Sequence, residues 1–217
     1  MNDDLRLREA LLATARAMAA ARLNAGTAGN ASVRTADGML ITPSGLAPDS
    51  CRPEDMVRVA PDGKSVGKLA PSSEWRFHAE LYAHRPEAGA VIHAHAPFAT
   101  ALACQRIEIP PFHYMIARFG GDTVRCADYA TFGTQALSDS VMAALEGRSA
   151  CLIANHGMVV FGRDLDHGLA LAIEFETLCE QYWRTLQLGP PVLLSAAQMT
   201  EAVERFSWYG KPAPNQG

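Results

Sequence analysis

The chain has 217 residues, 48% of them hydrophobic and 19% charged, which is the composition of an ordinary folded globular protein. Its formal net charge of −4 speaks against nucleic acid or an anionic membrane surface as a partner. No apolar run reaches the roughly 20 residues that a membrane span needs, and the charged start MNDDLRLREA lacks the pattern of a secretory signal.

The first half of the chain predicts helices interleaved with short strands. Leucine, alanine and methionine recur at a spacing of three or four near the N-terminus, which indicates a helix. Asp62-Gly63 marks a hairpin between two β-rich runs. In order, we expect helix 3–23, a Gly/Asn loop at 24–30, strands ASVR and GMLIT, a Pro-rich stretch at 43–61, strands VRV and KSV, helix 74–85 and strand GAVIHAH.

The second half continues this alternation and ends in helices. We expect helix 96–104, a strand near 124–126, helix 134–147, the strands ACLIAN and MVVFG, and two C-terminal helices. Short hairpin signals favour antiparallel pairing, so the prediction is one α/β domain over residues 1–217, with a mostly antiparallel central sheet flanked by helices. Five scattered cysteines without a Cys-x-x-Cys pair indicate reduced thiols and a cytoplasmic location.

A pair of histidines is the first candidate for chemistry. His93 and His95 in VIHAHAP are two residues apart, and such residues project from the same face of a strand. Two imidazoles side by side can bind one metal ion, although a strand histidine can also be a hydrogen-bonded polar residue without a ligand. His156 in the ANHG turn and Glu74 at a helix start are the best candidates for further ligands. Glu74 alone could equally be a carboxylate favoured by the helix dipole.

Three loops rich in glycine and small hydroxyl residues are candidates for anion binding: Thr27 to Asn30, Thr42 to Gly45 and Pro71 to Ser73. Backbone N–H groups at a helix start, with hydroxyl donors beside them, can hold phosphate without a cluster of Lys or Arg. The alternative is that Ser72-Ser73 simply caps the helix that follows.

Taken together, these segments resemble the class II aldolase/adducin family over nearly the whole chain. The resemblance is carried, in order and spacing, by GTAGNASVR, ITPSG, PSSEWRFHAELYAHRPEAGAVIHAHAP, HYMIARFGG, YATFGT and ANHGMVVFG. It is closest to the branch of aldolases that act on L-fuculose 1-phosphate. The combination of PSSEW, His-x-His and Asn-His-Gly is far more specific than any one of these motifs.

The resemblance implies a role for each motif residue. A divalent metal, Zn²⁺ or alternatively Mn²⁺, Co²⁺ or Fe²⁺, would be bound by His93, His95, His156 and Glu74, and Glu74 would also move protons. Tyr114 would act in the active site of a neighbouring subunit, since family members are homotetramers with sites at subunit interfaces. Phe132 and Tyr209 match aromatics beside the aldehyde half of the substrate. Phosphate would be held by Thr27, Gly29, Asn30, Ser44, Gly45, Ser72 and Ser73.

The implied reaction is cleavage of a small ketose 1-phosphate into dihydroxyacetone phosphate and an aldehyde. L-fuculose 1-phosphate, 5-deoxyribulose 1-phosphate and 5-methylthioribulose 1-phosphate are all candidate substrates. Arg118-Phe119 and Ala154-Asn155 depart from the pattern of the fuculose-phosphate aldolases, and these departures leave the aldehyde half open.

Three relatives in the same superfamily are alternatives. Ribulose-phosphate 4-epimerases share the fold and metal, but the segment FATALACQRIEIPPFHYMIARFGG resembles the aldolases and lacks the Asp-containing segment of the epimerases. A methylthioribulose-1-phosphate dehydratase would use the same metal and carboxylate in another reaction. Adducin-like scaffolds have lost the metal site, whereas His93, His95, His156 and Glu74 are all present here.

Overall fold

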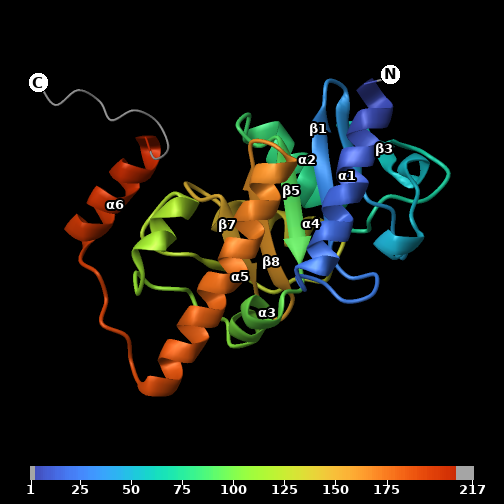
Figure 1. The fold of residues 1–217 in the computed structure, drawn as a ribbon. Coiled ribbons are helices and arrows are strands. Elements are labelled where there is room, and N and C mark those ends of the chain that lie inside the picture. The colour runs from blue at the N-terminus through green and yellow to red at the C-terminus, as the bar shows by residue number, and fades with distance from the viewer. Residues whose placement is uncertain (1–2, 209–217) are drawn as a thin grey trace, which may run out of the picture.

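A computed structural model describes residues 3–208, in which eight strands form one sheet (Figure 1). Their order across the sheet is β4-β3-β2-β1-β5-β8-β7-β6. The strands are β1 Asn30–Thr35, β2 Gly38–Ile41, β3 Val57–Val59, β4 Ser65–Val66, β5 Ala90–Ala94, β6 Cys126–Ala127, β7 Ala150–Ile153 and β8 Gly157–Gly162. The α-helices are α1 Asp3–Ala20, α2 Trp75–His84, α3 Pro97–Cys104, α4 Gln135–Ala144, α5 Leu165–Leu188 and α6 Ala196–Trp208. Three short 3₁₀ helices are η1 Pro48–Ser50, η2 Pro53–Asp55 and η3 Tyr114–Phe119.

Every strand pair in this sheet is antiparallel except β6 with β7, which confirms the predicted fold class. Hairpins join β1 to β2, β3 to β4 and β7 to β8, as the turn signals predict. The central pairings are long-range, and the register of β1 on β5 sets Asn30 opposite His93. On its other edge, β5 pairs with β8 so that Ala94 lies opposite Met158. The histidine strand therefore lies between β1 and β8.

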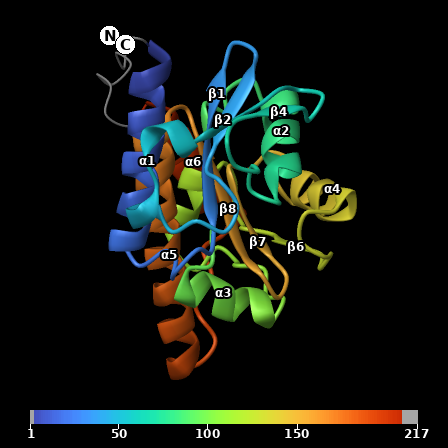
Figure 2. The ribbon, with the colours of Figure 1, turned by 90° about the vertical axis from the view of Figure 1, so that its right-hand side faces the viewer.

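Helices cover both faces of the sheet, with α1, α3 and α5 on one side and α2 and α4 on the other (Figure 2). Successive side chains of β5 point to opposite faces of the sheet, so they pack against both helix layers. Ile92 belongs to the core that includes Phe175 of α5, while Val91 belongs to the core that includes Phe77 of α2. Helix α6 packs on η3 rather than on the sheet.

Some predicted boundaries shift. The first helix ends at Ala20 rather than at residue 23, because the chain turns there and Arg22 has a φ of 58°. The strand expected near 124–126 is at Cys126–Ala127, since Val124 forms an isolated bridge with Ile109 instead of pairing with β7. Across residues 3–208 no helix combines the length and the hydrophobicity that crossing a membrane would take.

Candidate active site

Three histidines converge at the end of β5 and at the β7–β8 turn. His93 is within β5 and His95 follows its last residue, so the two side chains project to the same side. His156 lies in the tight turn before β8, preceded by Asn155 with a left-handed φ of 54°. A Cβ on the next residue, Gly157, would lie 2.4 Å from the carbonyl oxygen of Ala94. Only glycine lets this turn approach β5 so closely, and this approach brings His156 beside His95.

The imidazole nitrogens of these histidines are close enough to share one ion. One ligand nitrogen from each of His93, His95 and His156 lies within 4.8 Å of the others. His93 Nδ1 donates a hydrogen bond to the carbonyl of Met158 at 2.9 Å, so its Nε2 is the nitrogen available to a metal ion. That Nε2 is 3.1 Å from His95 Nε2. The three rings thus direct their nitrogens at a common point.

Glu74 completes the group as the residue immediately before α2. Its Oε2 is 3.1 Å from His93 Nε2 and its Oε1 is 3.3 Å from His156 Nε2. Asn30 on β1 donates a hydrogen bond from Nδ2 to Oε2 at 3.0 Å. Glu74 is buried, with only 6% of its surface exposed. Among residues 3–208, Oε1 has no hydrogen-bond partner.

The electrostatics favour an ionised Glu74 beside neutral His95 and His156 side chains. Burial raises the pKa of Glu74, but attraction to His93 and His156 and hydrogen bonds with His93 and Asn30 outweigh it and bring the pKa to about 2. Burial and repulsion by His93 lower the pKa of His95 to about 4, and the same causes lower the pKa of His156 to about 4. Neutral imidazoles and an ionised carboxylate are the forms that bind metal ions.

The spacing of these donors fits a tetrahedral metal ion. Ligand atoms at about 2.0–2.1 Å from a tetrahedral zinc lie roughly 3.3 Å from one another. The contacts from His93 to His95 and to Glu74 are both 3.1 Å, and the contact from His156 to Glu74 is 3.3 Å. A buried carboxylate oxygen without a hydrogen-bond donor is accounted for by a cation, so these residues fit the predicted metal.

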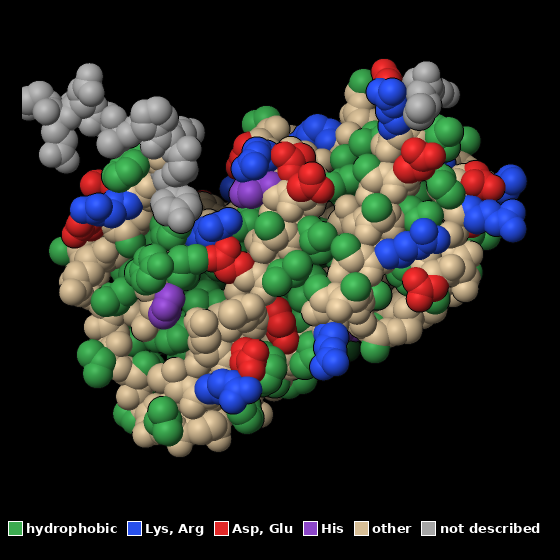
Figure 3. Space-filling model, viewed as in Figure 1, with side chains coloured by type: hydrophobic (Ala, Val, Ile, Leu, Met, Phe, Trp, Pro, Cys, Tyr) green, Lys and Arg blue, Asp and Glu red, His purple; other side chains and the backbone are tan. Residues whose placement is uncertain are grey.

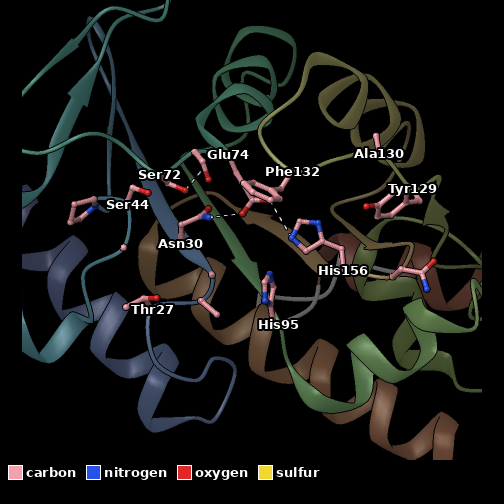
Figure 4. Close-up of a pocket in the computed structure, with 16 residues that line it drawn as sticks. Thr27, Asn30, Ser44, Ser72, Glu74, His95, Tyr129, Ala130, Phe132 and His156 are labelled. Carbon is pink, nitrogen blue, oxygen red and sulfur yellow. Dashed lines mark hydrogen bonds and ion pairs between the residues drawn. The ribbon is translucent and has the colours of Figure 1, made fainter.

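The predicted residues meet around one cavity of about 360 Å³ (Figure 4). Glu74, His95 and His156 form one part of its wall, with a dashed contact between Glu74 and His156 in the figure. All seven residues predicted to bind phosphate line the cavity, and Phe132 lies on it as well. His93 is behind this wall, with no exposed surface.

The cavity wall is suited to a small anion. Hydroxyl side chains line it at Thr27, Ser44 and Ser73, and no Lys or Arg is among the described residues that line it. The helix-capping alternative holds for Ser72, whose hydroxyl accepts a hydrogen bond from the Glu74 N–H at 3.3 Å at the start of α2. It does not account for Ser73, whose side chain is exposed. Its hydroxyl is thus available to a ligand.

Aromatic residues form an outer part of the cavity. Phe132 is 65% exposed and Tyr129, which the sequence analysis did not single out, is 56% exposed beside Ala130. Tyr129 and Phe132 are both in the YATFGT stretch, from which the sequence analysis selects Phe132 alone.

Tyr114 lies away from this cavity within the chain. It begins η3, is 54% exposed, and stacks on Phe206 of α6 with ring centroids 6.2 Å apart. Hydrophobic side chains gather over η3 on this face (Figure 3). Tyr209 lies outside the described residues.

Comparison with known proteins gives consistent matches across the chain. The family model described as "Class II Aldolase and Adducin N-terminal domain" matches residues 9–183. A 5-methylthioribulose-1-phosphate/5-deoxyribulose-1-phosphate aldolase of Rhodospirillum rubrum is 52% identical over 207 residues, covering 95% of this chain and 94% of the relative. An L-fuculose phosphate aldolase of Escherichia coli K12 is 45% identical over 189 residues, covering 87% of this chain and 88% of the relative. A solved L-fuculose 1-phosphate aldolase superposes with a TM-score of 0.90 at 36% identity, covering 93% of this chain and 96% of that one.

Proposed function

Because the chain belongs to the class II aldolase and adducin family, we propose that it is a divalent-metal-dependent aldolase. It cleaves a ketose 1-phosphate into dihydroxyacetone phosphate and an aldehyde. One observation carries this proposal: three imidazoles and the ionised Glu74 meet beside a cavity whose other wall carries hydroxyl side chains. Relatives that are named for sugar-phosphate cleavage support it.

The metal would be held by His93, His95 and His156, with Glu74 as the fourth ligand. Three imidazole nitrogens and one carboxylate suit zinc, the metal that we propose, and similar donor sets accept Mn²⁺, Co²⁺ or Fe²⁺. When bound, the cation supplies Lewis-acid stabilisation of the negative charge that cleavage leaves on the donor half.

Glu74 is the group placed to move protons. Cleavage turns the hydroxyl at C4 into an aldehyde carbonyl and releases its proton, while the electrons of the C3–C4 bond remain as an enediolate that later takes up one proton. An ionised carboxylate whose Oε1 lacks a hydrogen-bond partner within residues 3–208 can accept and return such a proton. Its place on the cavity wall puts it within reach of a bound sugar.

The hydroxyl-lined wall would hold the phosphate, and Ser73→Ala tests this. We expect the affinity for a phosphate-bearing enediolate analogue to fall roughly 10- to 100-fold, because a hydrogen bond to a charged group is worth about 1.5–3 kcal/mol. Isothermal titration calorimetry measures it, with Ser50→Ala, on the exposed η1, as the matched control. Equal affinities for both variants would place the phosphate elsewhere.

The aldehyde half would face Tyr129, Ala130 and Phe132, whose apolar surface favours a methyl or methylthio tail over a polar one. We therefore propose 5-methylthioribulose 1-phosphate and 5-deoxyribulose 1-phosphate ahead of L-fuculose 1-phosphate. A panel of these three substrates, read by dihydroxyacetone phosphate release, tests the function. Isomerised or dehydrated sugar without this product would instead identify an epimerase or a dehydratase.

Tyr114 would serve the cavity of a neighbouring subunit in a homotetramer. Its 54% exposure and the hydrophobic side chains that gather over η3 (Figure 3) support this placement. A phenol hydroxyl there can stabilise the oxygen that becomes the aldehyde.

This arrangement predicts complementation between defective chains. Tyr114→Phe and Glu74→Gln chains are each expected to be slow, but their mixed tetramers would contain some sites with both native residues. Activity above that of either parent, measured on purified hybrids, is expected. Hybrids no faster than the parents would mean that each site is built from one chain.

A further inference from the structure

A row of buried polar side chains leads from Glu74 into the interior between β1 and α2. Asn30 and Ser32 are two residues apart on β1 and face the same side. Glu74, the N-cap residue before α2, is followed at intervals of four by His78 and Tyr82, which share one face of α2. Ser32 and His78 have no exposed surface and Tyr82 has 8%. Polar groups buried this deeply are costly unless each finds a hydrogen-bond partner.

Each of these side chains does find one, in the next member of the row. Tyr82 OH is 2.8 Å from Ser32 Oγ, and Ser32 Oγ is 2.7 Å from His78 Nδ1. His78 Nε2 is 2.6 Å from Asn30 Oδ1, and Asn30 Nδ2 donates to Glu74 Oε2 at 3.0 Å. The row is thus continuous from the phenol to the carboxylate.

The orientation of the Asn30 amide sets the direction of every bond. Its Nδ2 donates to Glu74, and its Oδ1, which can only accept, faces His78. His78 therefore carries its proton on Nε2, and its bare Nδ1 accepts from the Ser32 hydroxyl. With that hydrogen used, Ser32 accepts from Tyr82. Burial lowers the pKa of His78 to about 3, in keeping with the neutral ring that this order needs.

The far end of the row is anchored to the backbone. Arg34 donates to the carbonyl of Tyr82 at 2.9 Å, and its guanidinium lies 4.8 Å from the centre of the Tyr82 ring. The same guanidinium donates to the carbonyls of Arg85 and Ala88. These contacts hold the end of α2 against β1, and they fix the position of Tyr82 at the far end of the row.

We propose that Ser32, His78 and Tyr82 are positioning residues for the proton-transferring carboxylate. They hold the Asn30 amide in one orientation, and Asn30 in turn holds Oε2 of Glu74, so that Oε1 stays directed at the cavity. An amide does not carry protons as an imidazole does, so the row orients Glu74 rather than relaying its proton. This inference rests on the proposed function, because it assigns the orientation a role in cleavage.

Ser32→Ala tests the row with little change in shape, and Ser138→Ala is its matched control. Ser138 is also fully buried, but within residues 3–208 its hydroxyl has no hydrogen-bond partner. We expect Ser32→Ala to lower kcat roughly 10- to 100-fold, the usual cost of losing a group that orients a metal-site residue. Metal content and affinity for the phosphate-bearing analogue should stay within about twofold, since neither depends on proton transfer. Ser138→Ala should leave kcat unchanged.

Two variants of His78 distinguish the loss of hydrogen bonds from a general loss of structure. His78→Gln can donate to Asn30 and accept from Ser32, whereas His78→Leu can do neither, so Gln should restore most of the kcat that Leu loses. If the two variants had equal kcat, or if Ser32→Ala matched Ser138→Ala, the inference would be wrong.

The tautomer of His78 gives a readout that needs no turnover. Imidazole ¹⁵N shifts of the metal-free protein should report a proton on Nε2 and none on Nδ1. A proton on Nδ1 would reverse the row and overturn the inference alone. A wild-type protein that released no dihydroxyacetone phosphate would instead refute the proposed function.

Discussion

Glu74→Gln is expected to lower turnover by roughly 10²–10⁴-fold, the range of general acid–base catalysis, while much of the metal remains bound. Glutamine keeps the size of the side chain and can still accept the hydrogen bond from Asn30. It cannot take up a proton at neutral pH. The three imidazoles remain to hold the ion. Turnover of dihydroxyacetone phosphate and metal content, measured on the same sample, check this expectation.

Glu176→Gln is the matched control for that substitution. Glu176 is a half-buried carboxylate, and it accepts hydrogen bonds from the N–H groups of Phe98 and Ala99 at the start of α3. Its loss should affect stability rather than turnover. Equal losses of metal and turnover in Glu74→Gln would make Glu74 a ligand only, and near-normal turnover would exclude both roles.

His93→Ala or His95→Ala is expected to remove bound metal and activity together. Two remaining imidazoles and a carboxylate make a poor site for zinc. Loss of a Lewis acid that supplies several kcal/mol should lower turnover by roughly 10³-fold or more. Elemental analysis and the cleavage assay measure the two effects.

His84→Ala, on the exposed side of α2, serves as the control for these variants and should keep both metal and turnover. If His93→Ala chains bound metal as well as His84→Ala chains did, the ion would lie elsewhere.

Much of the site could be predicted from short local patterns. The two-residue spacing of His93 and His95 needs only strand geometry to place both side chains together. The same holds for the antiparallel hairpins, whose turns are marked in the sequence. Glu74 and His156 are candidates from the residues alone, but assigning them to the same ion as the pair depends on family resemblance, because nothing local links a helix start and a distant turn to one point.

Long-range pairing explains what the sequence analysis missed. The sequence analysis does not single out His78, although its spacing of four from Glu74 and Tyr82 is visible in the sequence. The role of His78 depends on its hydrogen bonds with Ser32 and Asn30, and these residues contact α2 only because β1 packs beside that helix. Tyr129 was missed because it is in a loop without periodicity. Which way a loop side chain points is known only from the folded structure, where Tyr129 lines the cavity.

We propose above that the three histidines and Glu74 form a metal centre that cleaves the sugar phosphate. Reconstitution tests it most directly: the protein is stripped with a chelator, and Zn²⁺ is added back stepwise while dihydroxyacetone phosphate release from 5-methylthioribulose 1-phosphate is followed. We predict that activity is lost on stripping and returns in proportion to bound metal, up to one ion per chain. Cleavage at an undiminished rate by the metal-free protein would contradict the account.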